Sequence, residues 1–206
     1  GYPDQALSYS KRISEEIKKA GDAYIEVIAL TNSCYLHQFC RNRQAVEDRA
    51  ATVLTLASEK QFPVFGTTAR IFRQWALGSE RGGSNEIDSV LAGLADIRAT
   101  GSKEDLCYFH ALGAEILLDA GRIESALELV ATAIREAELT GELWYLAELH
   151  RLQGRLCIAS SPRRTEESLR EFELSLQIAR DQKARLWELR AATSLYQLCP
   201  DAGAGR

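Results

Sequence analysis

The feature that most constrains this sequence is a pair of interleaved columns of small residues, each recurring about every 40 positions. Gly113 lies inside an apolar pattern with helical spacing, where a glycine costs about 1 kcal/mol relative to alanine. Small side chains let two helices approach closely, so we expect the columns to mark the points where paired helices cross. The first column contains Ser33, Gln74, Gly113, Gly154 and Ala192, and the second contains Ala6, Ala45, Glu86, Ala126 and Ser168.

Two members of these columns are not small. Gln74 and Glu86 both fall in the second pair of helices. Because a larger side chain at a crossing point holds two helices apart, the sequence predicts looser packing or a bend in this pair.

Apolar residues recur with helical spacing along nearly the whole chain, and no segment alternates convincingly as a strand. Gly21, Gly101 and Gly141 each follow a predicted helix, where a left-handed residue is favoured. The pattern predicts ten helices, over residues 4–20, 23–40, 43–59, 63–78, 84–99, 104–120, 123–140, 142–159, 164–182 and 184–198.

We therefore predict an all-α fold in which antiparallel helix hairpins stack into a right-handed superhelical solenoid. The whole chain, residues 1–206, is predicted to form a single repeat domain. The predicted pairs span about 22–60, 62–101, 103–141 and 142–183, and helices 3–20 and 184–198 are left without a pair partner.

Two pairs of motifs resemble the tetratricopeptide repeat family, in a form with a longer period than usual. ALGAEI (111–116) is followed by ALELVATA (126–133), and LQGRL (152–156) is followed by SLREFELS (168–175). In that family, the first helix carries a Leu-Gly pair and the second carries small, aromatic and small residues. The resemblance places Ser168, Phe172 and Ser175 in these three slots. The first and second hairpins fit the family pattern only loosely.

A closer resemblance is to the C-terminal repeat region of large bacterial signalling proteins. The matching segments are GYPDQAL (1–7), AELHRLQG (147–154) and FELSLQIARDQKARLWELRAATSLYQL (172–198). In those proteins a nucleotide cyclase or DNA-binding domain is followed by a P-loop ATPase and then by the repeats. The resemblance implies a regulatory or binding module without the parent's catalysis. The start at Gly1 and the lack of methionine lead us to expect a piece of a larger protein.

Composition excludes several classes of function. The net charge, 25 − 29 = −4, argues against nucleic acid as the main ligand, because phosphate binding needs a basic face. There is no apolar run long enough for a membrane span or a signal peptide. The five cysteines are odd in number and are not clustered, which favours reduced thiols and a cytoplasmic location.

Signatures of catalysis and of cofactor binding are also missing, so we predict a non-enzyme without cofactor or metal. The sequence has no P-loop, H-E-x-x-H or G-x-S-x-G motif. GSERGGSN (78–85) follows no strand and indicates a loop rather than a nucleotide site. CYLHQFC (34–40) places its two thiols about 9 Å apart along a helix, too far for one ion. The histidines His37, His110 and His150 indicate groove or surface positions.

In the tetratricopeptide family the first helix of each pair lines a concave groove, and the resemblance selects one stripe of each first helix. Arg151 and Arg155 could hold a carboxylate of a partner, or they could pair with Glu148 on a solvated face. If they bind a partner, replacing both with alanine should weaken binding with little change in melting temperature. The predicted binding residues are Cys34, His37, Thr68, Ile71, Trp75, Cys107, His110, Glu148, Arg151 and Arg155. The stripe ends with Leu189, Thr193 and Tyr196.

Three functions remain open at this stage. The first is a non-catalytic module that binds a protein, a peptide, an effector or a neighbouring domain of the parent. The second is self-association, as a homo-oligomer joined through exposed terminal helices. The third, an enzyme of helical-repeat type, would need clustered titratable residues that the sequence does not offer. Among the aromatic residues, Trp144 and Trp187 are predicted to pack between hairpins, and Trp75 could contact a ligand.

Overall fold

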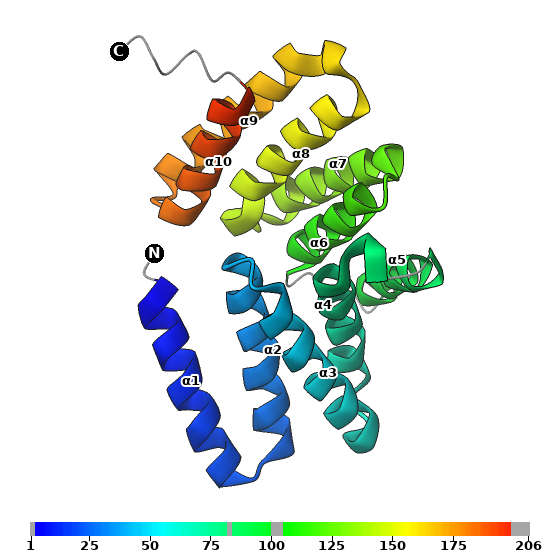
Figure 1. Cartoon of the computed structure of the whole chain (residues 1–206), viewed down its shortest axis with the longest axis vertical. Helices are drawn as coiled ribbons and strands as arrows, with labels where there is room; N and C mark the ends of the chain where they lie inside the picture. Colours follow the sequence, from blue (N-terminus) through cyan, green and yellow to red (C-terminus); the bar gives the residue numbers. More distant parts are fainter. Residues whose placement is uncertain (1–2, 82–83, 100–104, 199–206) are drawn as a thin grey trace. The chain divides into compact units, whose positions relative to one another are not determined.

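The computed structural model describes residues 3–81, 84–99 and 105–198, and within these ranges it contains helices and no strand (Figure 1). The ten predicted helices are confirmed, with ends that differ by a few residues. Two short 3₁₀ helices, Leu143–Tyr145 and Pro162–Arg164, precede α8 and α9. The helices are α1 (Pro3–Ala20), α2 (Ala23–Phe39), α3 (Arg43–Lys60), α4 (Pro63–Arg81), α5 (Ser84–Ala99), α6 (Leu106–Asp119), α7 (Ile123–Thr140), α8 (Leu146–Ser160), α9 (Thr165–Asp181) and α10 (Arg185–Leu198).

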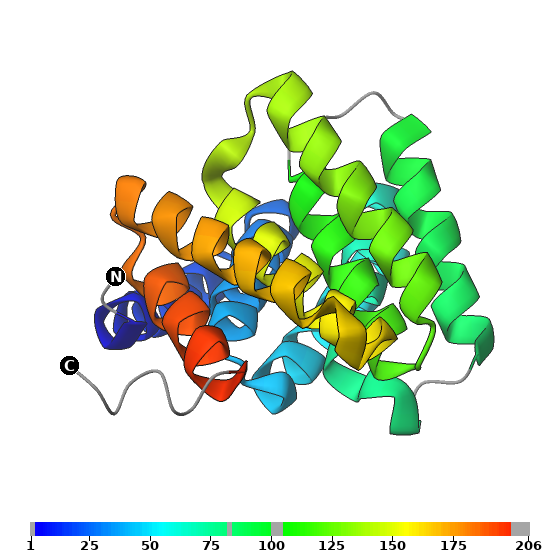
Figure 2. The ribbon, with the colours of Figure 1, turned by 90° about the horizontal axis from the view of Figure 1, so that it is seen from above.

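The chain divides into two compact units, each described by itself. The N-terminal unit spans Tyr2–Gly101 and the C-terminal unit covers Ser102–Arg206. In the N-terminal unit each helix packs on the next from α1 to α5, and α2 also contacts α4. In the C-terminal unit the same order runs from α6 to α10, and α8 contacts both α6 and α10 (Figures 1 and 2). Within each unit, helices that follow one another in sequence are therefore neighbours in space.

Local signals explain where the helices start and stop. The Asp22 side chain caps α2 by accepting hydrogen bonds from the backbone amides of Tyr24 and Ile25, at 2.9 and 3.2 Å. Gly21 and Gly141 follow α1 and α7 with φ of 68° and 76°, the left-handed conformation predicted for them. The third predicted stop signal, Gly101, lies outside the described residues.

For α8 and α9, the crossing predicted from the small-residue columns is confirmed. A Cβ on Gly154 would lie 2.6 Å from Phe172 Cε1 and 3.0 Å from the backbone oxygen of Ser168. The Ser168 hydroxyl donates to the Gly154 carbonyl at 2.8 Å, and the Ser175 hydroxyl donates to the Ala147 carbonyl at 2.7 Å. The hydroxyl groups of Ser168 and Ser175 on α9 are therefore satisfied by backbone carbonyls of α8.

Aromatic side chains join the first helices of successive pairs in the C-terminal unit. Tyr108 on α6 contacts Trp144 at a tilt and Tyr145 edge to face, with ring centroids 5.7 and 5.0 Å apart. Tyr145 in turn meets Trp187 of α10 at 5.4 Å. The prediction that Trp144 and Trp187 pack between hairpins is confirmed. In the N-terminal unit, Tyr35 of α2 packs on Phe72 of α4 in the same way.

The predicted bend in the second pair is also present. Gly78 has φ 67° and ψ −175°, and this non-helical conformation kinks α4 four residues after Gln74. Gln74 is buried, and its Nε2 has no hydrogen-bond partner. A buried amide without a partner costs about 1–3 kcal/mol, so Gln74 destabilises the second pair. The side chain of Glu86 lies outside the described residues.

This observation yields a first prediction, that Gln74→Leu stabilises the protein. The substitution removes the unpartnered amide and keeps most of the side-chain volume, so we expect a gain of about 1 kcal/mol in the free energy of unfolding. Urea denaturation of the wild type and the variant measures it. A loss of stability would show that the amide is satisfied in solution.

Candidate binding surface

All five predicted binding residues of the N-terminal unit are buried. Cys34, Ile71 and Trp75 are at most 1% exposed, and His37 and Thr68 are each 9% exposed. Their burial follows from their place on α2 and α4, which contact one another and α3. In this unit the predicted stripe is therefore part of the packed interior.

Two arginines lie over Trp75, the tryptophan that could contact a ligand according to the sequence. The guanidinium groups of Arg41 and Arg43 lie 5.6 and 4.9 Å from the centroid of the Trp75 ring, and Arg43 also donates to the Trp75 carbonyl. Arg41 adopts a left-handed conformation, with φ 57°, in the turn between α2 and α3. Cation–π contacts hold both arginines over Trp75, at the turn between α2 and α3.

The buried thiols are held in their protonated form. Burial raises the pKa of Cys34 to about 12, against a smaller opposing effect of Arg49. Burial, with Glu167 as the next cause, raises the pKa of Cys157 to about 11. Since the thiolate is the form that attacks substrates and binds metals, the folded chain disfavours the reactive form of both residues at neutral pH. Within the described ranges, no three His, Cys, Asp or Glu side chains group as a metal site would require.

His37 differs from the other two histidines because it faces a cation. Burial, and then the positive charge of Arg49, lower the pKa of His37 below its usual value. Its Nδ1 is buried without a hydrogen-bond partner. The folded N-terminal unit therefore disfavours the protonated form of this side chain.

We predict that stability decreases on acidification because of His37. As the pH falls through about 6.5, the unfolded chain takes up a proton that the folded chain does not, so unfolding becomes easier. In His37→Gln this contribution is absent, and the free energy of unfolding should vary less between about pH 7.5 and pH 5.5. Urea titrations at both pH values measure the two slopes. Equal slopes would contradict the role of His37.

Histidines of the C-terminal unit instead pair with glutamates. His110 Nδ1 on α6 lies 3.1 Å from Glu136 Oε2 on α7, and His150 Nδ1 on α8 lies 2.8 Å from Glu171 Oε2 on α9. Both histidines are buried, as is the predicted binding residue Cys107. These pairs join the first helix of each hairpin to its second helix, so their positions are explained by packing.

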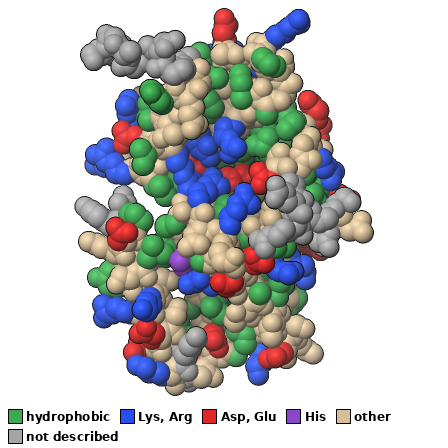
Figure 3. Space-filling view, viewed as in Figure 1, with side chains coloured by type: hydrophobic (Ala, Val, Ile, Leu, Met, Phe, Trp, Pro, Cys, Tyr) green, Lys and Arg blue, Asp and Glu red, His purple; other side chains and the backbone are tan. Residues whose placement is uncertain are grey.

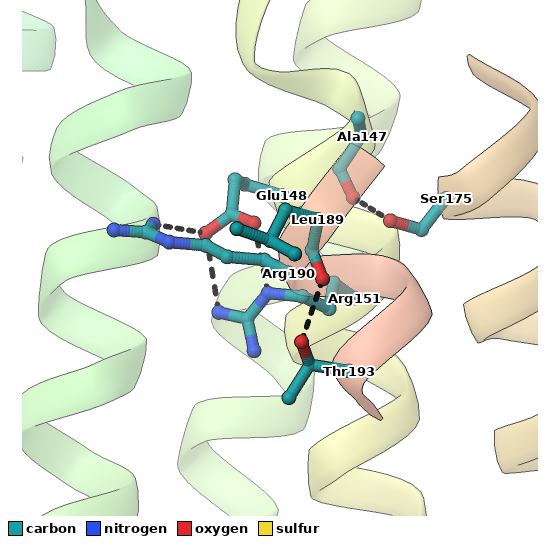
Figure 4. Close-up of polar contacts among 7 residues, drawn as sticks. All are labelled: Ala147, Glu148, Arg151, Ser175, Leu189, Arg190 and Thr193. Atoms are coloured by element: carbon teal, nitrogen blue, oxygen red, sulfur yellow. Dashed lines mark hydrogen bonds and ion pairs between the residues drawn. The ribbon is translucent and has the colours of Figure 1, made fainter. Parts of the chain in front are cut away.

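A cluster of three charged side chains connects α8 to α10 (Figure 4). Glu148 accepts two hydrogen bonds from Arg151, at 2.8 Å from Nε and 3.1 Å from Nη2, and one from Arg190 Nη1 at 2.8 Å. Glu148 and Arg151 are 2% and 6% exposed. The guanidinium of Arg190 also lies 5.0 Å from the centroid of the Trp187 ring. The sequence suggested that Arg151 either binds a partner's carboxylate or pairs with Glu148. The structure shows the pairing with Glu148, but the pair is buried and not on a solvated face.

The two helices that carry this cluster, α8 and α10, also carry exposed side chains. Arg155 lies one helical turn beyond Arg151 on α8 and is exposed. On α10, Leu189, Thr193 and Tyr196 are exposed on one side of the helix. We call these four residues the α8–α10 surface; all of them belong to the stripe predicted from the sequence. Figure 3 shows basic and acidic side chains side by side over this part of the molecule.

Sequence reasoning missed Arg190. It lies 42 residues after Glu148, close to one repeat period, so a search for opposite charges one period apart would have found it. The Glu148–Arg190 ion pair links the first helix of one pair to the next first helix. It therefore tethers α8 to α10 within the C-terminal unit.

Comparisons with known proteins show similarity to an uncharacterized protein. No protein-family model matches this chain. It is 27% identical over 192 residues to an uncharacterized protein of Rhizobium meliloti (strain 1021). The match covers 93% of this chain and 18% of the relative, so the chain spans less than a fifth of that relative's length. Of the described helices, none combines the length and apolar character needed to cross a membrane.

Proposed function

We propose that the chain is a tetratricopeptide-like helical-repeat module of a larger bacterial regulatory protein, which binds a protein or peptide in the cytoplasm and carries no catalysis. The observation that carries this proposal is the α8–α9 crossing, where Gly154 and Ser168 meet as the family pattern requires. The contacts of α8 with α6 and α10 further support a stack of hairpins.

The α8–α10 surface is the proposed binding site. It combines apolar area from Leu189 and Tyr196 with the positive charge of Arg155. A partner with an acidic residue beside apolar ones fits this chemistry, since guanidinium groups bind carboxylates strongly. Arg151 does not contribute a carboxylate site, because Glu148 occupies its guanidinium.

Selection from a random peptide library displayed on phage tests this proposal. We expect the selected peptides to be acidic and apolar and to lose binding to Arg155→Glu. The matched control is Arg170→Glu, an exposed arginine on α9, which should bind the peptides as the wild type does. Peptides that bind both variants equally, or only the wild type and Arg155→Glu, would place the site elsewhere.

Self-association is the second candidate function, and specific residues favour it. Large apolar side chains are exposed on both terminal helices, at Tyr9 and Ile13 of α1 and at Leu189 and Tyr196 of α10. Exposed apolar side chains on one helix face favour association.

A further inference from the structure

A group of polar side chains lies in the N-terminal unit where α1 and α3 pack on α2. The Arg49 guanidinium on α3 donates through Nε to the Ser33 hydroxyl on α2 at 2.7 Å, and through Nη1 to the Ala45 carbonyl at 3.0 Å. The Ser33 hydroxyl in turn lies 3.2 Å from the Ser10 hydroxyl on α1. Ser33 is 2% exposed, whereas Ser10 and Arg49 are half-buried. Three helices therefore bring one cation and two hydroxyl groups together.

Arg49 stands apart because none of the described carboxylates forms an ion pair with it. Two half-buried arginines of the C-terminal unit, by contrast, each pair with a glutamate: Arg164 with Glu167 at 2.7 Å and Arg190 with Glu148 at 2.8 Å. Partial removal of a cation from water costs free energy unless a counter-charge compensates it. No described residue accepts a hydrogen bond from Nη2 of Arg49, so this group can bind an anion.

His37 adds a buried polar atom to the same site. It lies one turn after Ser33 on the same face of α2, and its Nδ1 has no hydrogen-bond partner. The charge of Arg49 acts on this ring, because it adds to the larger effect of burial in lowering the pKa of His37. The side chain is 9% exposed. A buried ring nitrogen of this kind calls for a partner from outside the chain, such as a bound ion.

Charge and donor groups define the ligand. One guanidinium contributes a single positive charge and neutral His37 adds none, so a singly charged anion is compensated and a doubly charged one is not. The groups open to a ligand can all donate: Nη2 of Arg49, the Ser10 hydroxyl when Ser33 donates to it, and Nδ1 of His37 in the tautomer that carries its hydrogen there. Guanidinium groups bind carboxylates strongly. Because Ser33 and His37 are buried, the ligand has to be small.

We propose that Arg49, Ser10 and His37 bind the carboxylate of a small organic acid. Arg49 supplies the counter-charge, Ser10 and His37 donate hydrogen bonds, and Ser33 holds the guanidinium in place. The site is built only from residues of the N-terminal unit. It is therefore separate from the α8–α10 surface and does not rest on the proposed function.

NMR spectroscopy of the ¹⁵N-labelled chain tests the proposal with sodium acetate as the probe. At an ionic strength held constant with chloride, the Nε–Hε signal of Arg49 and the ring signals of His37 should shift and saturate as acetate is added. Acetamide, which has the shape of acetate without its charge, should leave both signals unchanged. Sulfate, which carries two charges, and N-acetyl-trialanine, which carries its carboxylate on a peptide, should both bind more weakly than acetate.

Variants separate the site from general binding of anions to the surface. Arg49→Gln should weaken acetate binding at least about tenfold, since it removes a charge-assisted hydrogen bond. Ser10→Ala removes one hydroxyl from a half-buried position and should weaken binding about 2- to 10-fold. Arg70→Gln is the matched control, at an exposed arginine of α4 in the same unit, and should bind acetate as the wild type does.

Several results would overturn the proposal. Shifts that do not saturate would show an ion attracted only to the surface, and equal binding by the wild type and Arg49→Gln would place the ion elsewhere. Tighter binding of sulfate or of N-acetyl-trialanine would exclude a small singly charged acid as the ligand. Circular dichroism establishes that each variant is folded. If Arg49→Gln is unfolded, Ser10→Ala decides, because undiminished binding by this variant removes the site.

Discussion

Replacing Gly154 with alanine destabilises the protein, although alanine is the better helix former. Helix propensity alone would favour the substitution by about 1 kcal/mol. The new methyl group, however, would lie 2.6 Å from Phe172 Cε1 and 3.0 Å from the Ser168 carbonyl oxygen. Phe172 is buried and the second contact is with backbone, so neither can move without shifting α9. Overpacking of this kind typically costs about 1–3 kcal/mol, and we expect a net loss in that range.

Gly66→Ala is the matched control for this prediction. Gly66 also lies in a helix and is buried, but its added Cβ would lie 3.7 Å from the Cβ of Ala57, an ordinary contact. Helix propensity should dominate at this position, so we expect Gly66→Ala to raise the free energy of unfolding by about 0.5–1 kcal/mol. Urea denaturation of both variants gives the comparison. If Gly154→Ala gained as much as Gly66→Ala, the close crossing of α8 and α9 would not exist in solution.

The helix pairs could be predicted from the sequence because a glycine at a close crossing, such as Gly154, is kept in spite of its poor helix propensity. Apolar spacing is a local property, and a small residue at a crossing point leaves a visible irregularity in a helical pattern. The irregularity recurs with the period of the repeat, which is why Ser168 can be matched to Gly154 from the sequence. The kink after Gln74 followed from the same reasoning, since it is where the column is interrupted.

The binding residues were harder to predict, because exposure depends on which side chains lie on the neighbouring helices. The stripe on α2 and α4 was assigned to a groove, but Ile71 and Trp75 are buried. Trp75 is covered by Arg41 and Arg43, and the cover depends on a left-handed turn at Arg41 that a non-glycine residue rarely adopts. No pattern of spacing indicates such a turn.

The arrangement of the two units relative to one another was also not accessible from periodicity. The columns extend from Ala6 to Ala192, so the sequence predicts a single array. Packing order is observed within the N-terminal unit and within the C-terminal unit. The single right-handed solenoid stays a prediction.

Arg151→Ala should be strongly destabilising, which differs from the expectation based on sequence alone. With Arg151 on a solvated surface, its removal would affect binding and leave stability almost unchanged. In the structure Arg151 donates two hydrogen bonds to Glu148, Arg190 donates another, and both Glu148 and Arg151 are buried. Removing one partner of a buried ion pair leaves a poorly compensated charge, which costs about 3–5 kcal/mol. Arg190 remains beside Glu148, so we expect a loss near the lower limit, about 3 kcal/mol.

A double-mutant cycle separates the ion pair from simple truncation. Glu148→Ala, Arg151→Ala and the double variant should give a coupling energy of about 1–3 kcal/mol, because the second substitution removes a charge that the first has left without its main partner. Arg155→Ala is the control, since it truncates the same residue type one turn further along α8 at an exposed position. Arg155→Ala should change the free energy of unfolding by no more than about 0.5 kcal/mol. If Arg151→Ala were equally mild, the guanidinium of Arg151 would be accessible and could bind a partner. If it is destabilising, Arg155 is the arginine through which ligand binding should be measured.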